Sequence, residues 1–154
     1  MWNRKRSVSL SIVICFIIAA VITLFIFAGP YFVQLWFSKY RGWAEISVIK
    51  HIITVFCACF YPSAVLGYIT LYSLLRLLFN IKKDEIFNTQ NVKYLRIISW
   101  CCFAVAIITL VGGVFYIPFI FITVAAGFIG LMLRIIKNVM QSAVSLREEN
   151  DLTI

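Results

Sequence analysis

Four long apolar stretches constrain this chain more than any other feature. At about 1.5 Å of rise per residue, about 20 residues of helix cross a hydrocarbon core of about 30 Å, and each stretch is long enough. The chain is 63% hydrophobic and 13% charged, with a mean hydropathy of +1.00, so it cannot coat a soluble fold with polar groups. We therefore expect a single all-α integral membrane domain whose transmembrane helices cover about residues 7–28, 49–75, 97–117 and 119–136.

Glycine and proline punctuate these stretches. Gly29-Pro30 is expected to break or kink the first helix, and Pro62 with Gly67 is expected to kink the long second one. Pro118 lies in a short, almost uncharged loop between the third and fourth helices. Helices joined this tightly run antiparallel, so the sequence predicts two antiparallel hairpins.

The segment Tyr31–Glu45 follows the first helix and is crowded with aromatic side chains, including Trp36 and Trp43. Aromatic rings of this kind commonly anchor a protein at the level of the lipid headgroups. A pocket for an amphipathic ligand is the alternative interpretation. Anchoring is the favoured one.

The distribution of basic residues predicts the orientation. Eleven of the fourteen Lys and Arg lie in the N-terminal, central and C-terminal segments, whereas three (Lys39, Arg41 and Lys50) lie in the segments that alternate with them. Basic residues near membrane helices accumulate on the cytosolic side. We therefore expect both termini and the central loop in the cytosol of a multi-pass protein of the bacterial cytoplasmic (inner) membrane.

The central polar segment, predicted as a cytosolic loop over residues 80–96, contains a helix-start signal. Asn88 can accept a hydrogen bond from the first turn, with Phe87 and Val92 in the flanking apolar positions and Asn91 where a capping-box partner would stand. After the fourth span, polar residues at spacings of three and four predict an amphipathic cytosolic helical tail over residues 137–154. Its apolar face could lie on the helix that starts at Asn88, on the bilayer, or on a separate protein.

The polar residues of the loop and tail are the candidate partner-binding residues, and anionic lipid headgroups are expected near them. The fourth span also carries small residues at spacings of three and four, which let another helix approach closely within one chain or between two, as in a homo-oligomer. The partner-binding candidates are Phe87, Asn88, Asn91, Arg96, Arg134, Lys137 and Asn138, and the helix-packing candidates are Thr123, Ala126, Gly127 and Gly130.

Residues for catalysis or metal binding do not assemble into a recognisable pattern. There is no phosphate-binding glycine motif, no acidic residue within the apolar stretches and a single histidine, His51, so we expect no enzyme activity, catalytic residue or cofactor site. Five cysteines all fall within apolar stretches, where they serve as small packing residues, and no metal site is expected. The basic residues form short clusters beside membrane helices, which argues against direct nucleic-acid binding.

The segments Leu77–Phe103 and Gly127–Ile154 resemble the small bacterial four-helix membrane proteins of the family called domain of unknown function 2975. The loop of that family commonly reads Phe-Thr-x-Glu-Asn, and here Asn88 and Gln90 stand where it has Thr and Glu. Asn still caps a helix, whereas Gln removes the charge that a salt bridge would need. The resemblance implies an inner-membrane protein without an established activity, often found beside a short helix-turn-helix regulator.

Two functional hypotheses follow. In the first, a four-helix bundle acts as a non-enzymatic membrane sensor or anchor, and its cytosolic loop and tail bind a soluble partner such as a small helix-turn-helix transcription regulator. In the second, the chain is a small transporter accessory or immunity-type protein that acts through its membrane-embedded face. The absence of acidic residues from the apolar stretches disfavours the second.

Overall fold

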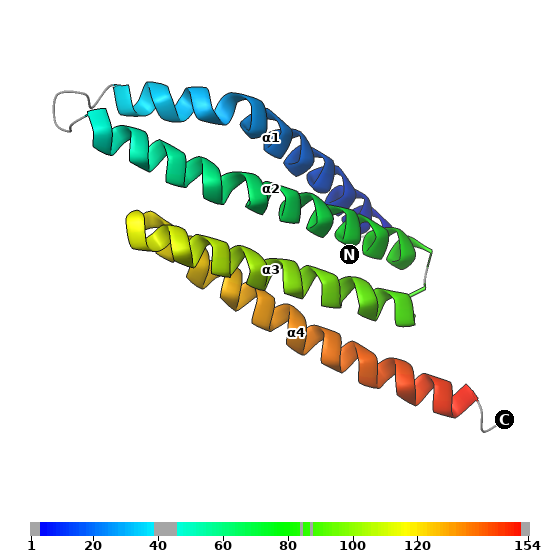
Figure 1. Cartoon of the computed structure of the whole chain (residues 1–154). Helices are drawn as coiled ribbons and strands as arrows, with labels where there is room; N and C mark the ends of the chain where they lie inside the picture. The colour runs from blue at the N-terminus through cyan, green and yellow to red at the C-terminus, as the bar shows by residue number, and fades with distance from the viewer. Residues whose placement is uncertain (1–3, 39–45, 84, 87, 152–154) are drawn as a thin grey trace.

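The computed structural model describes residues 4–38, 46–83, 85–86 and 88–151. Its regular elements are four α-helices: α1 (Arg4–Ser38), α2 (Ile46–Lys82), α3 (Thr89–Phe115) and α4 (Pro118–Asp151). Each is long and apolar enough to cross a membrane. The predicted fold class, an all-α integral membrane protein built from two antiparallel hairpins, is confirmed (Figure 1).

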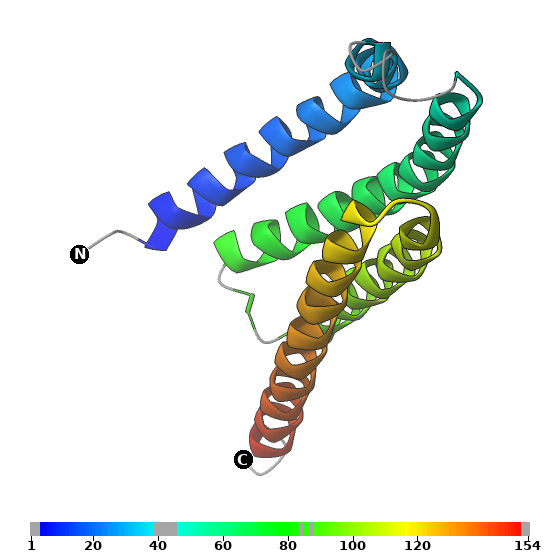
Figure 2. The same ribbon diagram turned by 90° about the vertical axis from the view of Figure 1, so that its left-hand side faces the viewer.

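The helices form an open row and not a closed bundle. Among the described residues, α1 packs on α2, α2 on α3 and α3 on α4, and no other pair of helices reaches backbone contact (Figures 1 and 2). The rings of Phe56 in α2 and Phe119 in α4 still meet, with their centroids 6.1 Å apart. A row is stable in a bilayer because lipid tails cover open apolar faces as well as protein does.

Helix α1 does not stop at Gly29-Pro30, where the sequence predicts a break or a kink. It continues to Ser38, and its second half runs in a clearly different direction from its first (Figures 1 and 2). Pro30 has no N–H to donate to the preceding turn, which permits a bend without ending a membrane helix. The first part of the aromatic segment is thus helical, while residues 39–45, including Trp43, lie outside the described residues.

Helix α2 contains 37 residues and is about 55 Å long at 1.5 Å per residue, well beyond the thickness of a hydrocarbon core. Pro62 lies inside it, and Figure 2 shows the helix changing direction along its length, as the predicted kink requires. The hydroxyl of Ser63, next to the proline, donates to the carbonyl of Cys59 at 2.7 Å.

Tight packing is concentrated between α3 and its two neighbours. A Cβ added to Gly112 would lie 2.7 Å from Cys59 Sγ of α2, and one added to Gly113 would lie 2.9 Å from Ile120 Cγ1 of α4. These glycines therefore allow a backbone approach that a side chain would block. These close contacts contribute to the burial of α3, which is the most buried of the four helices.

The two hairpins bring three features to one end of the molecule, which we call the terminal end: the start of α1, the end of α4 and the connection between α2 and α3. The connection covers residues 83–88 only, because α2 continues to Lys82 and α3 already begins at Thr89. It is shorter than the predicted loop over 80–96. Helix α4 runs unbroken through the predicted tail as far as Asp151, the last described residue, and projects past this connection (Figure 1).

Candidate functional site

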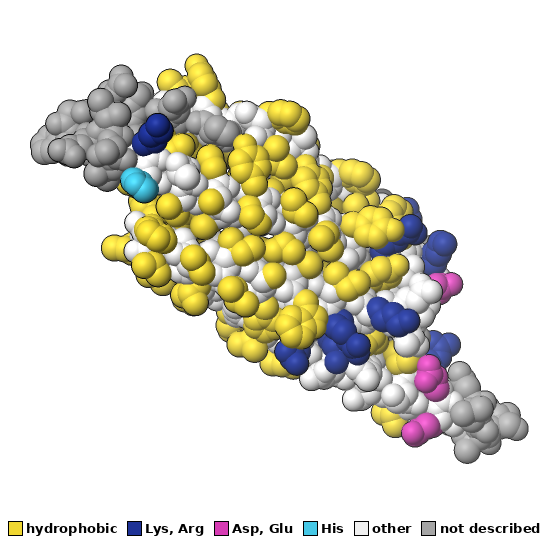
Figure 3. Space-filling model, viewed as in Figure 1, with side chains coloured by type: hydrophobic (Ala, Val, Ile, Leu, Met, Phe, Trp, Pro, Cys, Tyr) yellow, Lys and Arg dark blue, Asp and Glu magenta, His cyan; other side chains and the backbone are white. Residues whose placement is uncertain are grey.

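Charged side chains gather at the terminal end. Figure 3 shows Lys and Arg across the ends of the helices there, Asp and Glu beyond them, and a broad hydrophobic surface on the side of the membrane-spanning part. This distribution matches a molecule whose terminal end emerges from the bilayer into water. The candidate partner-binding residues lie in this region, and we therefore take it as the candidate site.

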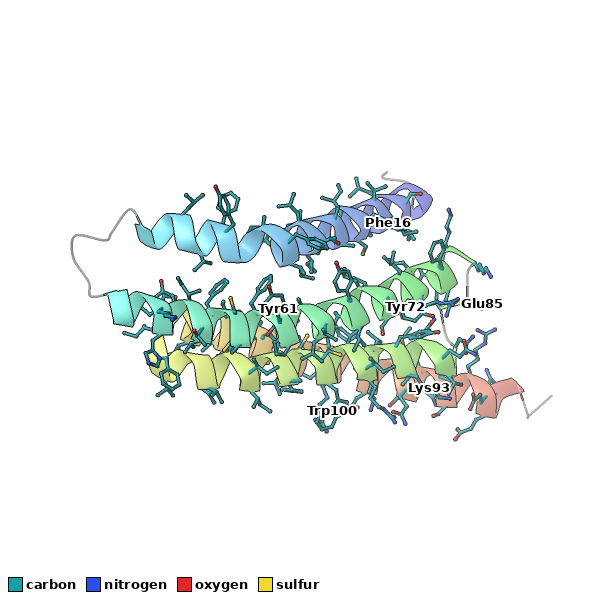
Figure 4. The ribbon with its side chains drawn as sticks, turned by 45° about the horizontal axis from the view of Figure 1, so that its top comes forward. Phe16, Tyr61, Tyr72, Glu85, Lys93 and Trp100 are labelled. Atoms are coloured by element: carbon teal, nitrogen blue, oxygen red, sulfur yellow. The ribbon has the colours of Figure 1, made fainter. Side chains whose placement is uncertain are left out.

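Two arginines near the terminal end lie over exposed aromatic rings. Arg76 of α2 donates from Nε to the hydroxyl of Tyr72 at 3.0 Å and lies 5.3 Å from the centre of its ring. Arg134 of α4 lies 5.7 Å from the centre of the Trp100 ring of α3. Tyr72 and Trp100 are both more than half exposed, as aromatic side chains at the headgroup level are. Figure 4 shows Trp100 on the side of α3 away from α2, with Lys93 closer to the terminal end.

Asn91 fixes the connection between α2 and α3. Its Nδ2 donates to the backbone carbonyls of Glu85 at 2.7 Å and Ile86 at 2.9 Å, and its Oδ1 accepts from Asn80 Nδ2 at 2.7 Å. The side chain is fully buried, with 0% exposure. One amide on α3 therefore holds both the connection and the end of α2.

The predicted helix start at Asn88 is confirmed. Asn88 is the N-cap of α3, with extended backbone angles, and its Oδ1 accepts from the backbone N–H of Gln90 at 3.0 Å. The end of α2 is closed by its own backbone, because the amide of Glu85 donates to the carbonyl of Asn80 at 3.0 Å. The connection is thus hydrogen-bonded at both of its ends.

The structure divides the partner-binding candidates into two groups. Arg96, Arg134 and Asn138 are exposed, and Asn88 and Lys137 are partly exposed. Asn91 is not available at the surface: a partner-binding role would require exposure, and its side chain is instead used to hold the connection. Phe87 lies outside the described residues.

The helix-packing candidates are used largely within the chain. Thr123 shares a hydrogen bond of 2.9 Å with Thr109 of α3, and the carbonyl of Gly130 accepts from Ser99 Oγ at 2.9 Å. Ala126 is partly exposed, and a Cβ at Gly127 would meet nothing within 4 Å. The α3 side of α4 is therefore defined by Thr123 and Gly130.

Sequence reasoning missed Asn80, Ser99 and Thr109, which supply the other halves of these hydrogen bonds. Each is a polar residue at or within an apolar stretch, and that is the signal that could have identified them, because such residues bond to neighbouring helices in a membrane. The five cysteines are free, and among the described residues no three His, Cys, Asp or Glu side chains are placed to hold a metal ion.

The fold and this site define a multi-pass α-helical membrane protein of unknown function, with a polar end formed by the 83–88 connection and the projecting part of α4. The family model described as Protein of unknown function (DUF2975) matches residues 38–154, and the chain belongs to that family.

The chain is also similar to the Uncharacterized membrane protein YoaS of Bacillus subtilis (strain 168). The two are 26% identical over 167 aligned positions, which cover 99% of each chain. No solved structure matches the chain. The matched family region begins at the end of α1, so it contains α2, α3, α4 and the whole candidate site.

Proposed function

We propose that this protein is a non-enzymatic membrane anchor or sensor whose terminal end faces the cytosol of a bacterium and binds a soluble protein there. A small helix-turn-helix transcription regulator is the candidate partner. The observation that carries the proposal is the lock around Asn91, because three hydrogen bonds hold the connection in one conformation beside the projecting α4. An ordered polar surface costs a partner less conformational entropy to bind than a loose loop does.

The orientation rests on charge. Eleven of the fourteen basic residues lie in the segments at the terminal end, which is the excess expected on the cytosolic side of a bacterial membrane. Arg76 and Arg134, each held by an aromatic ring, are placed at the headgroup level and would contact the phosphates of anionic lipids. These contacts would set the depth at which the polar end stands above the bilayer.

The binding surface runs from Asn88 at the start of α3 through Arg96 to Arg134, Lys137 and Asn138 on α4. It is basic and lies on the two helices that pack most extensively. A partner with an acidic patch would fit it, since complementary charge steers association and fixes register. The acidic residues Glu148 and Glu149 lie further out, near the end of α4.

The same hydrogen bonds suggest how a sensor would work. Asn80 lies in the last turn of α2 and Asn91 in the first turn of α3, and their side chains bond directly. A change in how the two helices pack within the bilayer would therefore move or break this contact. Breaking it would release the connection and alter the surface presented to the partner. A rigid element with two arrangements is what such coupling needs.

Purification of the intact protein from its native membrane tests the proposal. We expect a soluble protein to co-purify, and we expect Arg96→Glu and Arg134→Glu to lose it because they reverse the charge of exposed positions. Lys50→Glu is the matched control, since Lys50 is an exposed cation at the opposite end. Retention of the same protein by both reversed variants, or the absence of any co-purifying protein, would contradict the proposal. An unchanged partner together with altered solute flux or compound resistance would favour the transporter-accessory alternative.

A further inference from the structure

The face of α4 turned away from α3 carries a regular pattern of exposed residues, separate from the small residues that face α3. Eight exposed positions alternate at spacings of four and three residues, and all but one are apolar. We call this set the outer seam: Phe121, Ala125, Phe128, Met132, Ile135, Val139, Ser142 and Leu146. An alternation of three and four sustained over more than three heptads is the pattern of a coiled coil.

The outer seam is free of the rest of the chain. Among the described residues α4 makes backbone contacts with α3 alone, and Figures 1 and 2 show no other helix on its far side. The two hydrogen bonds to α3 are made at Thr123 and Gly130, which lie on the other side of the helix. The seam is therefore available along its whole length.

The seam continues past the point where lipid can cover it. Arg134 stands at the headgroup level over Trp100, and Val139 and Leu146 lie one and three turns further along α4. They are 65% and 66% exposed. In the bilayer an open apolar face costs nothing relative to lipid, but in water these two side chains favour burial against another surface.

A second copy of this chain fits the seam for a reason of symmetry. All copies insert with one topology, so α4 helices that meet are parallel, and parallel helices pair like positions with like. Val139 would meet Val139, and Leu146 would meet Leu146. The hydroxyl of Ser142 is already bonded to the carbonyl of Asn138 at 3.2 Å, so it does not require a partner across the seam.

Charge does not oppose this pairing. In the part of α4 beyond the lipid, the positions that flank the seam are the neutral residues Asn138, Ala143 and Ser145. The charged residues Arg134, Lys137, Arg147 and Glu148 occupy the remaining positions of the heptad. The next seam position after Leu146 is Glu149, where two carboxylates would face each other, so the pairing ends at Leu146. From Phe121 to Leu146 two copies can approach along the seam without bringing like charges together.

We propose that two copies associate through α4 along the outer seam, in a parallel two-helix arrangement that begins in the bilayer and continues into water. The proposal does not depend on the soluble partner, because Arg96 belongs to α3 and Lys137 lies two heptad positions away from the seam, seven residues after Gly130, so both stay outside such a dimer contact. The dimer would place two copies of the candidate site side by side.

Disulfide trapping in native membranes tests the pairing. Val139→Cys and Leu146→Cys place like sulfurs across the seam, and a water-soluble oxidant should link each variant into a covalent dimer. Gln141→Cys is the matched control, exposed at a similar height but off the seam, and it should stay monomeric. The unaltered chain, whose five cysteines lie within apolar stretches, reports any background. Equal linkage at position 141, or none at 139 and 146, would overturn the proposal.

A second measurement tests the same pairing without cross-linking. Native mass spectrometry of the intact protein from mild detergent should show a dimer, and Val139→Asp should shift it to monomer, because two carboxylates would face each other in the seam. Val139 is exposed, so the variant should fold, and an unchanged far-UV circular dichroism spectrum would verify this. A monomer before substitution, or a dimer that survives it, contradicts the seam. Retention of the soluble partner by the monomeric variant would keep the two proposals separate.

Discussion

The two hairpins of this protein differ in how closely their helices approach one another. In the most apolar 18-residue window of α1, 6% of the residues are buried, against 33% in that of α3. A Cβ on Gly67 of α2 would lie 3.5 Å from Ile22 of α1, an ordinary contact, whereas a Cβ on Gly112 or Gly113 of α3 would come within 3 Å of a neighbour. All four helices are strongly apolar and α1 is the most apolar of them, so apolar character does not explain the closer packing of α3. Small residues do, because they let membrane helices approach closely.

Polar side chains link the helices of both hairpins. Between α3 and α4, Ser99 bonds to the backbone of Gly130 and Thr109 bonds to Thr123, whereas between α1 and α2 the hydroxyls of Thr23 and Tyr68 meet. The family match covers residues 38–154 and so leaves out nearly all of α1. The predictions below test that contrast.

The largest effect is expected where three helices meet. Gly112→Leu would drive a side chain into Cys59 of α2 and Phe119 of α4, and overpacking of this kind should lower the free energy of unfolding by about 3 kcal/mol. Gly127→Leu is the matched control, because its Cβ would meet nothing within 4 Å. Unfolding by sodium dodecyl sulfate in mixed micelles, followed by circular dichroism, measures both. Equal effects of the two substitutions would mean that α3 is not the tight centre of the molecule.

The next effect concerns the connection. Asn91→Leu keeps the branching of the side chain but leaves the carbonyls of Glu85 and Ile86 and the amide of Asn80 without their partner, which should cost about 2 kcal/mol. Hydrogen exchange at the amide of Glu85 should accelerate, since that amide bonds to Asn80. Gln90→Leu, at an exposed neighbouring position, should leave the exchange unchanged. Unchanged protection in Asn91→Leu would show that the backbone alone holds the connection.

Much of the fold could be predicted because the bilayer imposes it. Length and apolar character located the four helices, and the cap at Asn88 marked the start of α3. The open row could not be predicted, since the face of a membrane helix that meets lipid is as apolar as the face that meets protein. The sequence left open whether α1 breaks or bends at Gly29-Pro30, because proline permits either, and the structure shows that the helix continues.

The sequence placed the candidate residues in segments that the structure brings together at the terminal end, but it did not predict how these residues are held there. Asn91 looked like a surface residue because local sequence places it in the first turn of α3, among polar neighbours. Its burial depends on the connection folding back over it and on Asn80, eleven positions earlier, reaching its side chain. A contact of that kind depends on how the two helices and their connection fold together, and no repeating pattern in the sequence indicates it.

A smaller effect is expected from removing a hydrogen bond between α3 and α4, and it distinguishes the contribution of polar contacts to stability from that of close packing. Thr109→Val removes the hydroxyl that meets Thr123, but Thr123 keeps its bond to the carbonyl of Phe119 at 3.0 Å, so no polar group is orphaned. The loss should be about 0.6 kcal/mol, the usual scale for hydrogen bonds between membrane helices. A double-mutant cycle with Thr123→Val measures the coupling directly. A coupling above about 2 kcal/mol would exceed the known range of such bonds and make polar contacts the main source of tightness in this hairpin.

The smallest expected effect is a change in stability that has opposite signs in the two hairpins. Gly67→Ala should leave stability unchanged or raise it by about 0.5 kcal/mol, because alanine favours helix and its Cβ fits beside Ile22. Gly113→Ala should lower stability in spite of the same gain in helix propensity, because its Cβ would lie 2.9 Å from Ile120 Cγ1 and 3.6 Å from the backbone of that residue. The same detergent titration compares the two. Stabilisation by both substitutions would indicate that α3 and α4 can move apart to accommodate a methyl group as readily as α1 and α2. The two hairpins would then differ in the distance between their helices but not in rigidity.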